Sequence, residues 1–237
     1  MGDENPAAVA AIASSLGVTA QVMNVCAYDN YTEFTFTPGA GYQLMLCVGN
    51  VTPAQATTIG DNLVSEGYGN TIIRIMWEPN GNWFPWGSEA LTAGQYIKAF
   101  RAAQQAFAAV PGNHFQYVWD LSAGAVTPGR TEFDTYPGNA YVTDIGFDWY
   151  DYNPATKTGV AASAVPPILT FAAIHDKPVS IDEWAMNGVD DPAFVNYVAS
   201  VVQSPYDRVS LQVYFDDGPS TLTALPKAEA AYVKDFG

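Results

Sequence analysis

Two short segments of the sequence are followed by carboxylates that could act as acids or nucleophiles. The first, Ile72–Trp77, is almost wholly apolar and is followed by Glu78. The second, Pro178–Ile181, is followed by Asp182 and Glu183. Because side chains alternate across a strand, an unbroken strand cannot turn both Asp182 and Glu183 toward the same face. One carboxylate from each segment therefore forms the candidate pair.

Two carboxyl groups held at a fixed separation are what glycoside hydrolysis requires. One group protonates the oxygen of the leaving sugar, and the other attacks the sugar or directs water. Six tryptophans also offer flat apolar faces against which sugar rings stack. Purely structural alternatives stay open, since Glu78 could cap the turn at Asn80-Gly81 and Glu183 could pair with a basic side chain.

Aromatic and acidic residues occur together where the expected strands end. These groups are Trp77-Glu78, Trp119-Asp120, Trp149-Tyr150-Asp151, Glu183-Trp184 and Tyr214-Phe215-Asp216. Trp83 and Trp86 follow the first carboxylate, so we expect them to form a platform for a sugar, with packing of a long loop as the alternative. Trp119 fits a core position as well as it fits a sugar contact.

Basic and sulfur-containing residues near the carboxylates suggest structural roles. Arg74 lies about 13 Å before Glu78 along an extended strand of roughly 3.3 Å per residue, so we expect it to be buried and paired with an aspartate. Cys26 and Cys47 end two neighbouring strands and are expected to be buried free thiols rather than a disulfide. The two cysteines and two histidines lack zinc-site spacing, so no metal is expected.

Seven short runs rich in Val, Ile, Tyr and Trp predict buried parallel strands. They are Gln21–Ala27, Tyr42–Val48, Thr71–Trp77, Phe115–Trp119, Asp144–Trp149, Val179–Trp184 and Val209–Phe215. Helices are expected after the start signals Thr52-Pro53, Thr92-Ala93 and Asp191-Pro192, and over Pro6–Leu16 and Leu222–Phe236. The mean strand spacing of about 31 residues is that of a βα unit.

Alternation of strands and helices predicts an α/β fold with a parallel sheet. A doubly wound sheet would normally carry a glycine-rich phosphate turn after an early strand, and none is present. Carboxylates and aromatics at several strand ends favour a single (β/α)₈ TIM-type barrel over residues 1–237. The helix at Pro6–Leu16 leaves too few residues for a first strand, so we expect seven core strands and a gap.

Composition narrows the classes of partner. The 237 residues include 24 acidic and 9 basic ones, a net charge of −15, which disfavours binding to nucleic acid and to anionic membranes. The apolar stretch Ala7–Val18 is too short to span a bilayer. The N-terminus lacks the cationic start of a secretory signal, but the acidity and scarce lysine are typical of a secreted protein after signal removal. No cofactor motif is present.

The segment Arg74 to Gly87 resembles the acid/base segment of glycoside hydrolase family 26, a clan A family of retaining glycosidases with (β/α)₈ barrels. It matches that family's Arg, Glu, Asn-Gly, both Trp and the Gly. The region Tyr136 to Asp151 is similar to the family's sixth-strand region, and Asp182-Glu183-Trp184-Ala185 is similar to its nucleophile segment. Trp77 stands where the family has a His that contacts substrate in mannanases, and this divergence puts mannan in doubt.

The resemblance implies roles for individual residues. Glu78 corresponds to the acid/base and Glu183, rather than Asp182, to the nucleophile. The candidate substrate-binding residues are Trp77, Asn80, Trp83, Trp86, Trp119, Trp149, Tyr150, Trp184 and Tyr214. Tyr150 is further expected to hydrogen-bond the nucleophile and keep it ionised.

The expected function is a retaining, endo-acting glycoside hydrolase that cleaves a β-linked polysaccharide of the β-mannan or β-glucan type and needs no cofactor. Its expected partner is a polysaccharide or oligosaccharide substrate. Two alternatives remain open at this point. One is an inactive carbohydrate-binding barrel, which the missing strand favours, and the other is a clan A glycosidase acting on a bacterial or phage-related glycan.

Overall fold

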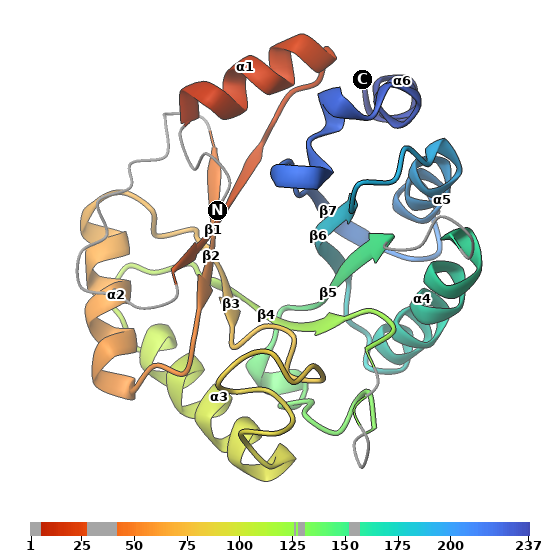
Figure 1. The fold of residues 1–237 in the computed structure, drawn as a ribbon. Coiled ribbons are helices and arrows are strands. Elements are labelled where there is room, and N and C mark those ends of the chain that lie inside the picture. Colours follow the sequence, from red (N-terminus) through yellow and green to blue (C-terminus); the bar gives the residue numbers. More distant parts are fainter. Residues whose placement is uncertain (1–5, 28–41, 126, 128–130, 152–156) are drawn as a thin grey trace.

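Seven parallel strands run side by side in chain order in the computed structural model, which describes residues 6–27, 42–125, 127, 131–151 and 157–237 (Figure 1). They are β1 (Val22–Ala27), β2 (Gln43–Val48), β3 (Ile72–Ile75), β4 (Gln116–Ser122), β5 (Asp144–Asp151), β6 (Val179–Met186) and β7 (Val209–Tyr214). Every neighbouring pair is parallel. All seven predicted strands are confirmed, and the sheet curls into a barrel.

Helices surround the strands on the outside (Figure 1). They are α1 (Pro6–Leu16), α2 (Pro53–Ser65), α3 (Ala93–Ala108), α4 (Lys157–Ile174), α5 (Pro192–Val202) and α6 (Pro226–Phe236). The predicted start signals cap them: Thr52 and Thr92 each form a capping box with the glutamine three residues later. Helix α4 was not predicted, because Pro166 and Pro167 lie inside it and suggest a helix break.

The last helix begins later than the sequence suggested. Leu222–Ala224 forms a short 3₁₀ turn, and α6 begins at Pro226. Proline suits the first turn of a helix because its missing N–H has no intrahelical partner there. The Asp216-Asp217-Gly218 sequence likewise leads into a 3₁₀ turn over Gly218–Ser220.

The barrel interior is apolar toward the amino ends of the strands and charged toward their carboxyl ends. Met45, Ile72 and Val118 pack together in the lower layer. Arg74 and Asp120 each come two residues after a member of that layer, so they project to the same side of the sheet, one level higher. Both are fully buried. The strands thus carry a charged cluster toward their carboxyl ends.

The sheet has two free edges, β1 and β7, within the described part of the chain. Figure 1 shows α1 and α6 on either side of the space between them. A cavity of about 680 Å³ lies there, lined by residues of α1, β1, β7 and α6. The side chains of β7 are mostly half-buried, whereas those of β3 are all buried. The predicted seven strands and gap are confirmed for the described residues.

Candidate active site

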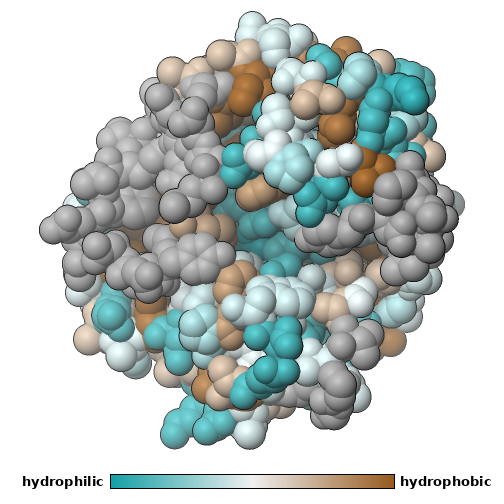
Figure 2. Space-filling view, in the orientation of Figure 1, coloured by the Kyte–Doolittle hydropathy of each residue, from teal (hydrophilic) through white to brown (hydrophobic). Residues whose placement is uncertain are grey.

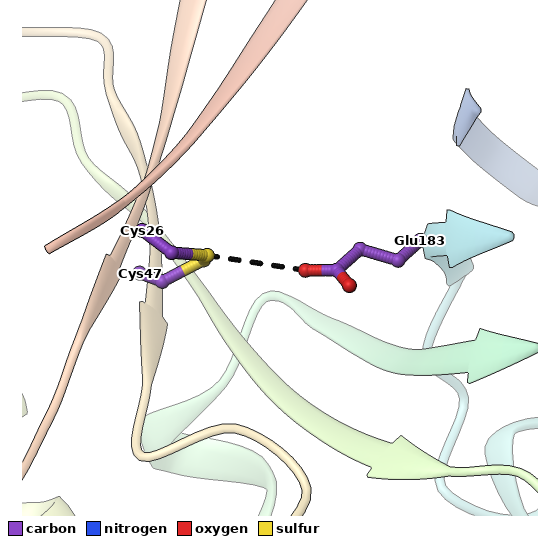
Figure 3. A group of neighbouring side chains, drawn as sticks. All are labelled: Cys26, Cys47 and Glu183. Atoms are coloured by element: carbon purple, nitrogen blue, oxygen red, sulfur yellow. Dashed lines mark hydrogen bonds between the residues drawn. A yellow bond between two sulfur atoms is a disulfide. The ribbon is translucent and has the colours of Figure 1, made fainter. Parts of the chain in front are cut away.

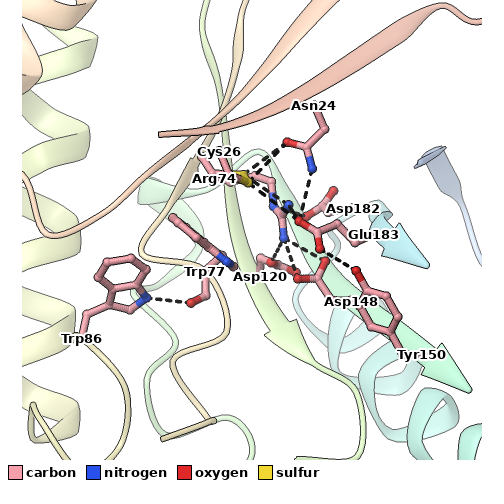
Figure 4. Close-up of a disulfide and its surroundings, with 11 residues drawn as sticks. Asn24, Cys26, Arg74, Trp77, Trp86, Asp120, Asp148, Tyr150, Asp182 and Glu183 are labelled. Atoms are coloured by element: carbon pink, nitrogen blue, oxygen red, sulfur yellow. Dashed lines mark hydrogen bonds and ion pairs between the residues drawn. A yellow bond between two sulfur atoms is a disulfide. The ribbon is translucent and has the colours of Figure 1, made fainter. Parts of the chain in front are cut away.

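Arg74 lies at the centre of a cluster of four carboxyl groups (Figure 4). Its Nη1 lies 2.7 Å from Oε1 of Glu183, and its Nη2 lies 2.7 Å from Oδ2 of Asp148. Nη2 also contacts Asp120, and Nε lies 3.6 Å from Oδ2 of Asp182. The guanidinium is fully buried, as predicted, and it organises side chains from β4, β5 and β6.

The neighbouring carboxylates keep the Arg74 guanidinium positively charged. Burial alone lowers the pKa of the guanidinium, but the surrounding carboxylates, led by Asp120 and Asp148, outweigh that effect and raise its pKa well above the usual value. Burial also raises the pKa of Asp120 to about 6, although Arg74 opposes this shift. Four acids therefore share one cation in the interior of the barrel.

A bulge in β6 brings Asp182 and Glu183 into the same cluster. Phe147 of β5 pairs with Ile181, but the next residue, Asp148, pairs with Glu183, which leaves Asp182 as an extra residue. The expectation that only one of the two acids can face the interior is therefore wrong, because strict alternation holds only for an unbroken pleat. Gly146 leaves room for this arrangement, since a Cβ at that position would overlap the Asp182 carboxyl.

Glu183 is held by three hydrogen bonds. Its Oε1 accepts from Nη1 of Arg74 at 2.7 Å and from Nδ2 of Asn24 at 3.3 Å. Its Oε2 accepts from the Tyr150 hydroxyl at 2.8 Å, so the predicted bond from Tyr150 is confirmed. The side chain is 13% exposed, which leaves the carboxylate fixed and still open to the barrel mouth. Asn24 was not predicted; its position two residues before Cys26, on the same side of β1, was the available signal.

Glu78 lies just beyond β3 on an unusual backbone. Both Met76 and Glu78 adopt left-handed φ angles, 49° and 51°, which non-glycine residues rarely do and which cluster at functional sites. The strand therefore ends at Ile75, two residues before the predicted end. The backbone N–H of Glu78 donates to the Asp120 carbonyl at 3.0 Å, so the turn is tied to β4.

The Glu78 carboxyl has an environment opposite to that of Glu183. Burial and the negative charges of Asp120 and Glu183 raise its pKa to about 7, while a hydrogen bond from Trp83 lowers the pKa. That bond runs from Trp83 Nε1 to Oε2 over 2.6 Å. Glu78 can thus hold a proton near neutrality, whereas Glu183 faces a guanidinium. The two candidate catalytic groups thus lie in contrasting surroundings, as their predicted roles require.

Two exposed aromatic rings flank the carboxylates. The Trp83 side chain is 52% exposed, and its indole lies over Gly81, where a Cβ would overlap the ring. Phe215, which is 36% exposed, lies with its ring centre 6.0 Å from that of Tyr150, which donates to Glu183. Phe215 was not among the predicted site residues, although the sequence places it directly after β7, at the end of a barrel strand.

Three of the predicted substrate-binding tryptophans point away from the site. Trp119 packs on Tyr136 and Phe171, Trp149 on Phe194 and Tyr197, and Trp184 on Tyr232 and Phe236. Each is at most 1% exposed. At these positions the three tryptophans cannot contact a sugar in the hollow directly. The reason is alternation: each tryptophan is next to an inward acid on its strand and therefore faces the outer helices.

Tyr214 also faces outward. It pairs in register with Trp184, its ring packs on Trp184 and Tyr232, and its hydroxyl donates to the Ser220 carbonyl at 2.7 Å. Its neighbour Phe215 is the aromatic residue of this strand end that lies beside Tyr150. The candidate sugar contact at this strand end is therefore Phe215 and not Tyr214.

The loop after Glu78 is stabilised by residues that were expected to bind sugar. Trp77 is 3% and Trp86 is 4% exposed, and the indole of Trp86 donates to the Trp77 carbonyl at 2.7 Å. Asn80 is 4% exposed; its amide donates to the Ser122 carbonyl at 2.8 Å and accepts from the Ser122 N–H at 3.0 Å. These three side chains hold the loop in place. Of the expected platform, Trp83 is exposed and Trp86 is buried.

Cys26 and Cys47 form a disulfide beside the site, so the expectation of free thiols is wrong. The two residues are direct partners in the β1–β2 ladder, with Cα atoms 4.5 Å apart, and this spacing lies within the usual disulfide range of about 4.4–6.8 Å. The Cys26 sulfur lies 3.9 Å from Oε1 of Glu183 (Figure 3). Ligand atoms of these three residues lie within 4.8 Å of one another, but bridged sulfurs are not thiolates, the form that binds metals.

The face seen in Figure 2 is hollowed at its centre, and hydrophilic side chains lie in the hollow. The parallel strands, the surrounding helices and two carboxyl groups in contrasting environments define a protein of the (β/α)-barrel glycoside hydrolase class. The chain belongs to glycosyl hydrolase family 26, whose sequence profile matches residues 55–200. The resemblance seen in the sequence is thereby confirmed.

This chain matches only part of the length of its named relatives. Endoglucanase H of Acetivibrio thermocellus is 26% identical over 186 residues, which are 73% of this chain and 21% of that protein. A mannan endo-1,4-beta-mannosidase of Bifidobacterium adolescentis is 34% identical over 124 residues, which are 49% of this chain and 12% of that protein. The chain thus spans about a fifth or less of these relatives.

Solved structures agree on the fold. The GH26 beta-mannanase BoMan26A of Bacteroides ovatus superposes with a TM-score of 0.67 at 14% identity, covering 94% of this chain and 80% of that one. GH26A of Muricauda sp. MAR_2010_75 gives 0.61 at 16% identity, covering 97% and 86%. At these identities the likeness establishes the barrel.

Proposed function

We propose that this chain is a retaining, endo-acting glycoside hydrolase that cleaves a β-linked polysaccharide. Glu183 attacks the anomeric carbon and forms a glycosyl–enzyme bond, while Glu78 donates its proton to the leaving oxygen. Glu78 then takes a proton from the water that releases the sugar. The observation that carries this proposal is the contrast between Glu78, whose pKa is raised to about 7, and Glu183, which is bonded to Arg74 and Tyr150.

The substrate is proposed to be a β-glucan or a β-mannan. The named relatives are an endoglucanase and a mannan endo-1,4-beta-mannosidase, so similarity supports both. Trp77 is buried in the loop rather than turned to the hollow, so it does not take the place of a substrate-contacting His. Trp83 and Phe215 are the exposed rings beside the two carboxylates, and we assign them the stacking of sugar units.

The compartment is proposed to be extracellular. A disulfide is typical of oxidising compartments, and the excess of acidic residues agrees with this proposal. Among the helices that the structure describes, none is long and apolar enough to cross a bilayer.

The test is a panel of glycans with wild-type protein and the Glu183→Ala variant. We expect released reducing ends from β-mannan or mixed-linkage β-glucan, with xylans and bacterial cell-wall glycans as comparison substrates. Glu183→Ala should abolish turnover and leave oligosaccharide binding measurable. The first-formed product should have the β configuration by ¹H NMR, because two successive displacements at the anomeric carbon retain the configuration of a β-linked substrate.

A carbohydrate-binding barrel without activity is the second candidate, and the open sheet edge between β1 and β7 favours it. Binding of a glycan without any released reducing end would support that alternative. An α product would instead exclude the retaining mechanism, and turnover by Glu183→Ala would move the nucleophile elsewhere, with Asp182 the first residue to examine.

A further inference from the structure

The Cys26–Cys47 disulfide lies directly beside the proposed nucleophile, Glu183. Its Cys26 sulfur is 3.9 Å from Oε1 of Glu183, and its Cys47 sulfur is 3.4 Å from Nη1 of Arg74. The same Nη1 donates to the same Oε1 at 2.7 Å. The two sulfurs therefore touch both members of the ion pair that holds Glu183 (Figures 3 and 4).

The disulfide is less deeply buried at Cys26 than at Cys47. Cys26 and Glu183 are both partly exposed, whereas Cys47 is fully buried beneath them. A small dithiol entering from the barrel mouth would meet the Cys26 sulfur first. Thiol–disulfide exchange begins with a thiolate attacking one sulfur of the bridge, so access to one sulfur is sufficient.

We propose that Cys26 and Cys47 form a thiol–disulfide exchange site whose oxidation state controls the nucleophile Glu183. The ligand class is a low-molecular-weight dithiol or thiol. A dithiol gives two electrons and two protons to the pair, so the Cys26–Cys47 bond breaks, two thiols form, and the dithiol leaves as its own disulfide. Oxidised glutathione reverses the exchange and is reduced to two molecules of glutathione.

The physical effect follows from what each state of sulfur can do. Bridged sulfurs carry neither a proton nor a charge, so Arg74 Nη1 is committed to Glu183. After reduction, the Cys47 thiol gains a proton to donate to Oδ1 of Asn24, which lies 3.2 Å from its sulfur and whose amide donates to Glu183. The Cys26 thiol gains a proton to donate to Oε1. Both changes draw Glu183 away from its arrangement in the bridged protein, and the nucleophile becomes weaker.

The experiment compares the protein oxidised with glutathione disulfide and reduced with dithiothreitol. This inference rests on the proposed function, so kcat on the best glycan is the first readout. Charged hydrogen bonds contribute enough that weakening one should lower kcat about tenfold on reduction, with recovery on reoxidation. The second readout needs no turnover: the ¹³C resonance of the Glu183 carboxyl, assigned through Glu183→Gln, should move on reduction.

Two double variants separate the effect of the hydrogen-bond donors from that of the covalent link. Cys26→Ser/Cys47→Ser keeps two hydrogen-bond donors without a bridge and should have the low kcat of the reduced protein. Cys26→Ala/Cys47→Ala lacks both donors and bridge and should lose less activity than the serine pair. Neither variant should respond to dithiothreitol. Circular dichroism melts verify that each variant is folded.

The outcomes are distinct. An unchanged kcat together with an unmoved Glu183 resonance overturns the exchange site. If the alanine pair is as impaired as the reduced protein, the bridge is only a structural link and the exchange site is overturned. A response of either variant to dithiothreitol also overturns the exchange site. A protein that turns over no glycan in either state, but whose Glu183 resonance moves on reduction, contradicts the proposed function and supports the exchange site.

Discussion

Glu78 and Glu183 differ because of what surrounds them, and this difference is the chemistry of the site. Glu78 is buried with acids as neighbours, while Glu183 accepts hydrogen bonds from a cation, an amide and a phenol. Identical side chains are thereby placed in contrasting surroundings. A test of the roles must therefore address each carboxyl separately.

Replacing Glu78 by Ala should affect substrates according to their leaving groups. A polysaccharide leaves as a poor alkoxide and needs the proton, so its hydrolysis should fall by about 10²–10⁴-fold. An aryl glycoside with an activated phenol barely needs protonation, and its pre-steady-state burst should persist. Stopped-flow release of the phenol measures this rate. Equal losses on both substrates would mean that Glu78 positions the sugar instead.

The pH dependence of kcat/KM should report the raised pKa of Glu78. Because the acid must be protonated to act, activity should fall as pH rises above about 7. Trp83→Phe removes the hydrogen bond that lowers this pKa and keeps an aromatic face. We expect its alkaline limb to move to higher pH. A limb that stays in place or moves to lower pH would separate Trp83 from the titration of Glu78.

The sequence reveals the two glutamates, Arg74 and Tyr150, because residue type and position at a strand end carry the signal. It does not reveal Asn24, Asp182 or Phe215 as partners of the site. Asn24 is an ordinary polar residue in the first strand, and its role appears only when the barrel brings β1 and β6 to the same centre. Contacts across the barrel depend on closure, which local patterns do not encode.

At the scale of elements, the strands follow from the sequence and their irregularities do not. Apolar runs mark all seven strands, but the β6 bulge and the left-handed turn after β3 have no pattern of their own. The bulge decides that Asp182 faces inward. Alternation along β4, β5 and β6 turns Trp119, Trp149 and Trp184 outward, so aromatic residues that suggest a sugar site pack against the helices instead.

Replacing Asp182 by Asn should stabilise the protein increasingly as pH rises. Burial and nearby acids raise the pKa of Asp182 well above its usual value, despite Arg74. The wild-type carboxyl favours folding below its unfolded pKa, about 3.9, and this contribution is lost as pH rises through the folded value. Asn has the same shape and no such loss, so its gain in Tm should be larger at pH 8 than at pH 4.

Differential scanning fluorimetry at the two pH values measures this gain, and each kcal/mol corresponds to roughly 2–4 °C for a domain of this size. Asp176→Asn serves as the matched control, because Asp176 forms an exposed ion pair with Arg208. An Asp182→Asn protein less stable than wild type at pH 8 would show that the ionised carboxylate is required by Arg74.

At the scale of the whole molecule, the open edge sets this barrel apart from a closed one. Parallel barrels normally pair every strand on both sides, which removes free edges. Here β1 and β7 each have one unpaired side within the described chain, and a cavity of about 680 Å³ separates them. The active-site cluster draws on β1 as well as on β3 to β6, so the opening lies beside functional residues.

Hydrogen exchange should show that opening as a gradient across the sheet. Amides of β3, β4 and β5 are bonded between neighbours and buried, so they should exchange only through global unfolding. Amides of β1 and β7 that point toward the gap have no partner strand among the described residues and should exchange through local opening, which costs far less free energy. Residue-resolved exchange by NMR would measure both sets, with amides of β1 that bond β2 as the internal control. Uniform protection across all seven strands would mean that the two edges are paired in solution, whether with each other or with a further strand, and that the barrel is closed.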